Sequence, residues 1–318
     1  MKEIHDINEF EKIGMFVTHN GIAHCDDKIA TVLCSMFKYV TSNCDDETMK
    51  ESILGINILG ISRIGHDMVK EMIEKDTGVD IMLMFDIGGG QFDHHQKDAR
   101  MRPEDKIYDG RGDCKYSACG LLWNEFGHQW LSRVTGCKQE KALNRGWTVV
   151  DKVLQSIDRQ DNYGPVDGYN ALSSVMSYYD NMHNPKHSFE ESVKNTFEFM
   201  FPIIKEAMNV IEQSCQAQSY EDISIKGVFI NYDPISKESI TKIPAAVFAD
   251  TNILYMIVPS LNDTGKFNVI GIGNQTIPKL IEAGKDGCTF VHATRFMAVF
   301  DSLERAKDVA FWAASLVE

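Results

Sequence analysis

The sequence predicts an α/β protein with two domains. Strands and helices alternate over the first half, and the strands are continuous apolar runs, as in a parallel sheet with helices on both faces. The 318 residues suit two domains better than one. Apolar side chains make up 43% of the chain, which is enough to fill a core in each domain.

The first elements alternate between strand and helix. Residues Met15–Thr18 predict a buried strand that ends directly at His19. The next helix begins near Asp26 or Asp27, since acidic side chains suit the positive end of the helix dipole. Its apolar residues recur on one face: Ile29, Val32, Leu33, Met36, Phe37 and Val40.

Further strands and helices follow. We expect a strand at Ile56–Ile61, a helix from Ser62 to about Lys75, and a strand at Ile81–Phe85. Two helices, near Ser117–Phe126 and Lys138–Ile157, complete the first domain. Residues 181–188 read as a linker, which gives domains of residues 1–185 and 186–318.

The second domain is predicted to be a smaller α/β unit. A helix from about Phe189 to Ser219 leads into it, and a last helix lies near Leu303–Leu316. Its strands are expected near Gly227–Asn231, Ile253–Val258, Phe267–Ile272 and Phe290–Ala293.

The charge balance limits the kind of partner. Lys and Arg number 32 against 46 Asp and Glu, for a formal net charge of −14. This excludes a broad basic surface for non-specific duplex binding, which needs many contacts from cations to phosphates. A phosphate substrate is still compatible, because bound metal ions can supply positive potential at one site.

Cysteine usage and the amino terminus indicate the compartment. The eight cysteines include no CxxC pair, so neither a zinc knuckle nor a disulfide scaffold fits. The start of the chain is polar, and we find no secretory signal and no apolar stretch near 18 residues. We expect a reduced, cytoplasmic protein that does not enter a membrane. Cys25 reads as a small packed cysteine rather than as a nucleophile or a metal ligand.

Histidine and aspartate gather at three places in the first domain. They are the segment from Thr18 to Asp27, Asp86 at the end of an apolar run, and the triplet Asp93-His94-His95. Ligands of parallel α/β sheets collect at the carboxyl ends of strands, so His19 and Asp86 are expected to meet there. Gly88-Gly89-Gly90 predicts a tight turn that lets these residues converge, with phosphate binding as the alternative.

A metal centre is the simplest use of these side chains. The candidate ligands are three carboxylates and three imidazoles with no sulfur: His19, His24, Asp26, Asp86, His94 and Asp158. Such oxygen and nitrogen donors favour Mn²⁺, with Mg²⁺ as the alternative. Six ligands exceed the need of one catalytic ion, so we expect two ions that share a carboxylate. Paired ions bind the attacking and departing oxygens of a phosphoryl displacement, which predicts hydrolysis of a phosphate ester or anhydride.

Four ordered segments resemble a known family. Residues 18–27 follow the motif Thr-His-x-Gly-x-x-His-x-Asp-Glu, with Asp27 in place of Glu. Residues 86–95 are similar to Asp-x-Gly-Gly followed by Asp-His-His, residues 116–123 to Ser-Ser-Ala-Gly-Leu-x-Trp, and residues 157–164 to Ile-Asp-x-x-Asp-Asn-Gly. Together they resemble the melanocyte-proliferating-gene exonuclease family, also described as metal-dependent protein hydrolases. That family is a branch of the Asp-His-His (DHH) phosphoesterase superfamily.

The resemblance implies a role for each site residue. His19, His24 and Asp86 would hold one ion, and Asp26, Asp86, His94 and Asp158 the other, with Asp86 bridging. His95 would face the substrate and donate to a phosphate oxygen or leaving group, while Asp93 would orient His94 or support the end of the sheet. The superfamily fold implies a site in the cleft between two domains.

The carboxyl-terminal half departs from the family pattern. The segment from Phe290 to Phe296 matches Phe-x-His-x-x-x-Phe, but Met297 and the residues after it replace the expected Gly-Gly turn. Amides for a phosphate are therefore expected to be missing there. His292, Arg295 and Lys266 become the candidate substrate-binding residues, although His292 and Arg295 fit a buried histidine and a surface arginine equally well.

The leading hypothesis is a two-metal phosphodiesterase, an exonuclease acting on RNA or short oligonucleotides. The alternatives are a hydrolase of small phosphoanhydrides or cyclic dinucleotides, and a metal-stabilised binding module without turnover. A homodimer is the default expectation for its assembly.

Overall fold

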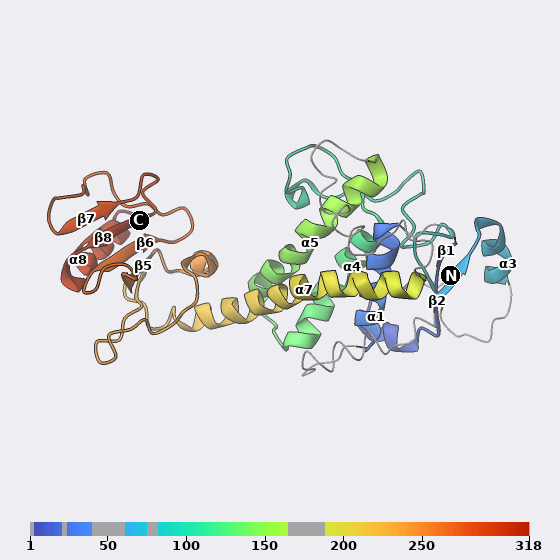
Figure 1. Cartoon of the computed structure of the whole chain (residues 1–318), viewed down its shortest axis with the longest axis horizontal. Coiled ribbons are helices and arrows are strands. Elements are labelled where there is room, and N and C mark those ends of the chain that lie inside the picture. The colour runs from blue at the N-terminus through green and yellow to red at the C-terminus, as the bar shows by residue number, and fades with distance from the viewer. Residues whose placement is uncertain (1–2, 21–23, 40–60, 75–81, 165–187, 318) are drawn as a thin grey trace. The chain divides into compact units, whose positions relative to one another are not determined.

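Figure 1 shows the fold as given by a computed structural model of residues 1–318. The structure describes residues 3–20, 24–39, 61–74, 82–164 and 188–317. These residues divide into two compact units, Met1–Ile211 and Glu212–Glu318.

A parallel sheet forms the centre of the first unit. Its strands are β1 (Met15–His19), β2 (Ile61–Ile64) and β3 (Met82–Met84), in the order β2-β1-β3. Both neighbours run parallel to β1, so all three strands end at the same edge. The sheet therefore delivers the residues that follow β1 and β3 to one place.

Helices cover both faces of this sheet, as the sequence predicts. On one face Val17 and Met84 pack against Val69 and Met72 of α3 (Val69–Glu74). On the other face Phe16 meets Phe10 of the 3₁₀ helix η1 (Ile7–Lys12), with ring centroids 6.3 Å apart. Phe10 in turn packs edge-on against Phe37 of α1 (Cys25–Tyr39).

Two long helices support the sheet on the side of α1. In α4 (Ala118–Thr135) and α5 (Glu140–Tyr163), Trp123 and Trp147 each donate an indole N–H to the other's backbone carbonyl, at 3.2 and 3.3 Å. A Cβ at Gly127 would lie 2.7 Å from the ring of Trp123, so only glycine fits at this crossing. The pair holds α5 in a fixed register, which matters because its last turn reaches the site.

The second unit is a smaller α/β structure, as expected. Its mixed sheet has the order β4-β5-β6-β8-β7. Helix α8 (Leu303–Ser315) packs on one face through its buried alanines, and the 3₁₀ helix η5 (Ala245–Asp250) contributes to the core of the other. The strands are β4 (Val228–Ile230), β5 (Tyr255–Pro259), β6 (Phe267–Gly271), β7 (Cys288–Val291) and β8 (Met297–Phe300).

Some element boundaries differ from the sequence predictions. Ser62 lies inside β2, paired with Val17, and the turn of 3₁₀ helix before α3 starts only at His66. Residues 56–60 of the predicted strand lie outside the described residues. Strand β8 begins at Met297, because this apolar run pairs with β6 instead of forming a turn.

Helix α7 (Phe189–Ser219) has the predicted bounds and crosses the division between the units. A Cβ at Gly146 would lie 2.5 Å from Ile211 and 2.6 Å from the carbonyl of Ala207, so α7 packs closely on α5. The division therefore falls after Ile211, whereas the sequence places it at 185/186. Most of the predicted linker, residues 181–187, lies outside the described residues.

Candidate metal centre

The ends of two parallel strands deliver the first ligands. His19 is the last residue of β1, and Asp86 lies two residues after β3. The Nε2 atom of His19 lies 3.2 Å from Oδ2 of Asp86, as the predicted sheet edge requires. His19 Nδ1 lies 2.6 Å from the carbonyl oxygen of Asn20, which accepts the ring proton and leaves Nε2 directed at the carboxylates.

Asp86 has a left-handed backbone, with φ of 57°. Aspartate tolerates this region better than most residues, and such geometry is concentrated at functional sites. Gly88 and Gly89 also have positive φ, and the Asp86 amide donates to the carbonyl of Phe92 at 3.0 Å. The glycine run is thus a tight turn that brings the triplet back to the strand ends.

The first turn of α1 supplies two carboxylates. Asp26 is fully buried, and Asp27 accepts hydrogen bonds from the Thr18 hydroxyl at 2.8 Å and the His24 amide at 2.9 Å. His19 Nε2 also approaches Asp27, at 2.8 Å. These hydrogen bonds fix the start of the helix beside the strand end. Asp27 is not among the ligands predicted from the sequence.

His94 joins the strand ends to α5. Its Nε2 atom lies 2.9 Å from Asp86 Oδ1, 3.0 Å from Asp161 Oδ2 and 3.9 Å from Asp26 Oδ2. Burial alone would lower the pKa of His94, but Asp161 and Asp86 outweigh it and raise the pKa to about 11. Around this nitrogen the chain concentrates negative charge.

Several buried polar atoms at this point make no hydrogen bond, even though His94 Nε2 and Asp86 Oδ1 lie only 2.9 Å apart. Among the described residues they include both carboxylate oxygens of Asp26, Oδ1 of Asp86 and Nε2 of His94. Burial, together with repulsion from Asp86 and Asp161, raises the pKa of Asp26 well above its ordinary value. Orphaned buried carboxylates cost free energy, and a divalent cation relieves that cost. The donors therefore fit a metal ion.

The ligand atoms form overlapping groups instead of one cage. Atoms within 4.8 Å of one another make up four sets, which share Asp26, Asp27, Asp86 and His24. The sets are His19, His24 and Asp27; Asp86, His94 and His95; His24, Asp26 and Asp161; and Asp26, Asp27 and Asp86. Five of the six predicted ligands, all but Asp158, fall in these sets.

Asp158 is bound elsewhere. Its carboxylate accepts Arg102 Nε at 2.6 Å, the Ser117 hydroxyl at 2.6 Å and the Ser117 amide at 2.9 Å. A Cβ at Gly120 would lie 2.4 Å from Asp158 Oδ1, so the carboxylate packs tightly against the first turn of α4. The structure places Asp161, one helical turn later, where the sequence predicts Asp158.

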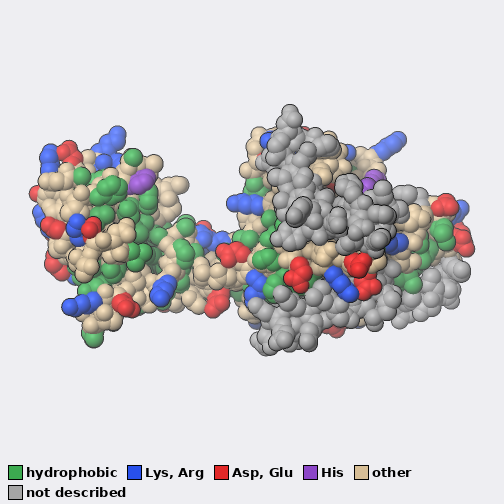
Figure 2. Space-filling view, in the orientation of Figure 1, with side chains coloured by type: hydrophobic (Ala, Val, Ile, Leu, Met, Phe, Trp, Pro, Cys, Tyr) green, Lys and Arg blue, Asp and Glu red, His purple; other side chains and the backbone are tan. Residues whose placement is uncertain are grey.

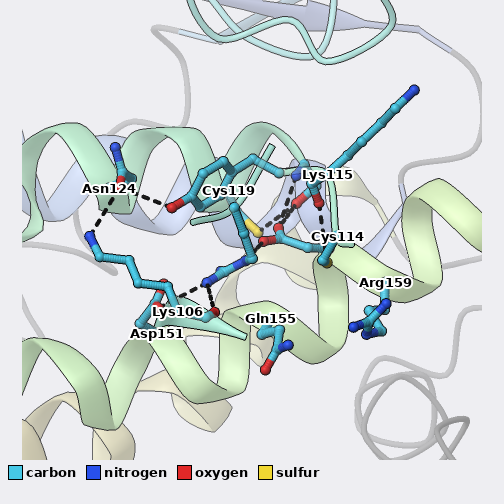
Figure 3. Close-up of polar contacts among 12 residues, drawn as sticks. Lys106, Cys114, Lys115, Cys119, Asn124, Asp151, Gln155 and Arg159 are labelled. Carbon is cyan, nitrogen blue, oxygen red and sulfur yellow. Dashed lines mark hydrogen bonds and ion pairs between the residues drawn. The ribbon is translucent and has the colours of Figure 1, made fainter. Parts of the chain in front are cut away.

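Arg102 and Asp158 belong to a buried polar network between α4 and α5, part of which Figure 3 shows. Arg102 also contacts Asp151 at 2.8 Å, and Tyr108 donates to the same carboxylate at 2.8 Å. Burial would lower the pKa of Arg102, but Asp158 and Asp151 raise it. The network is a structural clamp that joins the segment after the triplet to α5.

Asp93 contacts His95, whereas the resemblance implies that it orients His94 or supports the end of the sheet. The His95 side chain is 58% exposed, and its Nδ1 lies 3.1 Å from Asp93 Oδ1 and 3.4 Å from Asp86 Oδ1. The hydrogen bond to Asp93 raises the pKa of His95. The other oxygen of Asp93 accepts the Gly89 amide at 2.7 Å, so this amide is engaged within the turn.

The three candidate substrate residues lie in the second unit. Arg295 donates to the carbonyls of Ile277, Pro278 and Ile281, which is a structural use of its guanidinium. Lys266 pairs with Asp263 at 3.2 Å, while the His292 ring packs on Phe296 with centroids 4.4 Å apart. The backbone contacts account for the guanidinium of Arg295, so this residue needs no substrate to explain it. His292 and Lys266 stay predicted substrate contacts.

An α/β sheet whose strand ends and flanking helices gather these imidazoles and carboxylates forms a candidate metal centre. The chain belongs to the MYG1 exonuclease family: residues 15–279 match the family model described as MYG1_exonuc, uncharacterised protein family (UPF0160). The human protein MYG1 exonuclease is 25% identical over 149 residues, 46% of this chain and 34% of that protein. The match thus spans about a third of that relative's length.

Two solved structures of the exonuclease RecJ are also similar. RecJ in complex with Mn²⁺ from Thermus thermophilus is 12% identical with a TM-score of 0.27, covering 98% of this chain and 54% of that one. A second exonuclease RecJ, bound to manganese, is 11% identical with a TM-score of 0.26, covering 100% and 96%. TM-scores this low do not establish a common arrangement of the whole chain.

Proposed function

We propose that this chain is a two-metal-ion phosphoesterase that hydrolyses phosphodiester bonds, acting as an exonuclease on RNA or short oligonucleotides. The observation that carries the proposal is the convergence of unpartnered buried atoms from Asp26, Asp86 and His94 beside Asp161. Membership of a family named for an exonuclease supports the nuclease reading over hydrolysis of a small phosphoanhydride.

The ligand set we propose differs from the sequence prediction at one position. His19, His24 and Asp86 would hold one ion, and Asp26, Asp86, His94 and Asp161 the other, with Mn²⁺ expected and Mg²⁺ as the alternative. Asp158 leaves the set because Arg102 and Ser117 already satisfy its carboxylate. When bound, such ions supply positive charge to the oxygens of a transferring phosphoryl group.

His95 is the proposed proton donor. Asp93 Oδ1 holds its Nδ1 atom, so the ring is oriented while most of the side chain stays accessible. The hydrogen bond to Asp93 raises the pKa of His95, which favours the protonated ring, and Nε2 of that ring can donate to the leaving oxygen. Asp93 positions this ring and closes the glycine turn.

The proposal extends to the second unit, the cellular compartment and the assembly. The second unit would bind the substrate, with His292 and Lys266 as contacts. The seven cysteines that the structure describes form no disulfides with one another, which supports a reducing compartment such as the cytoplasm. No helix in the described part of the chain is long and apolar enough to cross a membrane. A homodimer is the proposed assembly.

A substrate screen tests the activity. The protein, loaded with Mn²⁺, is incubated with end-labelled single-stranded RNA, duplex DNA, a cyclic dinucleotide and pyrophosphate. Stepwise shortening of the RNA from one end is the expected result, and chelation should abolish it. Cleavage of pyrophosphate or the cyclic dinucleotide alone would favour the small-molecule alternative. Ion binding without cleavage of any substrate would favour the binding module.

A further inference from the structure

Asn162 lies next to Asp161 in the last turn of α5 and contacts the triplet. Its Oδ1 atom lies 3.2 Å from Nδ1 of His94. Asn162 has no role among the sequence predictions, because an asparagine near a helix end usually reads as a capping or turn residue.

The amide orientation of Asn162 is determined by its other contacts. Nδ2 donates to the carbonyl of Asp158 at 2.9 Å and faces the carbonyls of Tyr116 at 3.3 Å and Lys115 at 3.4 Å. Carbonyl oxygens can only accept, so the NH₂ group must face them and Oδ1 must face His94. A flipped amide would set an oxygen against three carbonyl oxygens.

This orientation selects the tautomer of His94. Because Oδ1 of Asn162 only accepts, Nδ1 of His94 must carry a hydrogen and donate it. In the neutral ring the lone pair is then on Nε2, the atom that lies 2.9 Å from Asp86 and 3.0 Å from Asp161. That nitrogen is the one a metal ion would use.

We propose that Asn162 is a positioning residue that keeps a hydrogen on Nδ1 of His94 and fixes the ring, so that Nε2 is the nitrogen that gives up its proton when an ion binds. The inference rests on the proposed ion site. Residues 115 and 116 precede α4, and Asp158 and Asn162 lie in α5, so one amide ties the triplet to both helices. Two neighbouring residues of α5 thus have different roles: Asp161 would supply a ligand atom, and Asn162 would orient the ring of His94.

Two substitutions separate the functions of the amide. In Asn162→Leu the acceptor for Nδ1 is lost, and we expect the Kd for Mn²⁺ to rise by roughly 10–100-fold, the usual effect of removing a partner of a ligating histidine. In Asn162→Asp the acceptor for Nδ1 remains but the NH₂ group that faces the three carbonyls is lost, so the Kd should rise by less than in Asn162→Leu. Titration calorimetry measures both, and circular dichroism checks that each variant is folded.

Asn124→Leu is the matched control. Asn124 also carries an amide beside this network, but among the described residues its side chain contacts those of Tyr116, at 3.0 Å, Lys106, at 3.4 Å, and Arg100, and not His94. The affinity of this variant for Mn²⁺ should match that of the wild type. An equal loss in Asn124→Leu and Asn162→Leu would mean that the effect is general destabilisation, and the inference would be wrong.

The tautomer itself is observable. Long-range ¹H–¹⁵N spectra of the Mg²⁺-loaded protein, with labelled histidine, should show His94 protonated at Nδ1 and unprotonated at Nε2. A wild-type His94 protonated at Nε2, or an Asn162→Leu protein with unchanged affinity and tautomer, overturns the inference alone. Failure of the wild-type protein to bind either ion overturns the inference together with the proposed function.

Discussion

Two buried aspartates show how surroundings decide a residue's role. Asp26 and Asp158 are both fully buried, and burial raises the pKa of each. Arg102 and Ser117 oppose the shift at Asp158 and satisfy its oxygens, whereas both oxygens of Asp26 lack partners. A satisfied carboxylate stabilises the fold, and an unsatisfied one among other carboxylates attracts a cation.

At His95 we predict a loss of turnover without a loss of ions. In His95→Gln the proton donor is removed, so kcat should fall by roughly 10²–10⁴-fold, the range of general acid catalysis. Metal content, measured by elemental analysis, should not change. The control is His5→Gln, since His5 pairs with Glu125 through an exposed contact outside the ligand sets. Unchanged turnover in His95→Gln would exclude the proposed role.

A pH dependence of stability is expected at Asp109. Burial would raise the pKa of Asp109, but hydrogen bonds from Arg159, at 2.8 Å between Nη2 and Oδ1, lower it below 3.8. A lowered folded-state pKa means that the pair stabilises the protein above about pH 4 and loses this effect as the pH falls through the folded-state value.

The test is Asp109→Asn in ion-free protein. Because Arg159 would lose its buried partner, the free energy of unfolding at pH 7 should fall by roughly 3 kcal/mol. Urea unfolding from pH 7 to 3 should give a constant difference from the wild type down to about pH 4 and a smaller one below. A difference that grows at low pH would contradict the assigned ion pair.

At the scale of elements, hydrophobic pattern predicted most of the fold. Strand β1, helix α7 and the parallel edge that joins His19 to Asp86 follow from apolar runs and helical spacing. The start of α3 did not, because Ser62 has the features of a helix cap but pairs within a strand. Strand β8 was not predicted, because the family pattern places a Gly-Gly turn where this chain has the strand.

The sequence also could not distinguish which of Asp158 and Asp161 lies beside His94. Both lie near the end of α5 one turn apart, and both fit a motif of the same residue types. Asp158 continues the buried stripe of Leu154 and Ile157, which places it inside the helix packing. Gly120 was the available signal, since a glycine in the first turn of α4 leaves room for a packed carboxylate.

The clamp between these elements should be essential to stability. Arg102→Leu leaves Asp151 and Asp158 buried without their cation, so we expect a loss of roughly 3–5 kcal/mol in the free energy of unfolding. Arg305→Leu is the control, because its pairs with Asp286 and Asp308 are exposed and should contribute less than about 1 kcal/mol. Denaturant unfolding compares the two variants. Similar losses would show that the buried ion pairs contribute no more to stability than the exposed ones.

At the scale of the whole molecule, charge agrees with a substrate held at one site. The net charge is −14, and on the face that Figure 2 shows, basic side chains are interspersed with acidic ones among the described residues. A phosphate substrate, as proposed, would then be attracted mainly by ions at the strand ends and not by a basic surface.

Ion binding by paired variants tests the central claim most directly. Calorimetric titration with Mn²⁺ compares wild-type protein, Asp161→Asn and Asp158→Asn. We predict two ions for the wild type, loss of one ion or a large fall in its affinity for Asp161→Asn, and two ions with reduced stability for Asp158→Asn. Full binding by Asp161→Asn together with loss of an ion in Asp158→Asn would contradict the site described above.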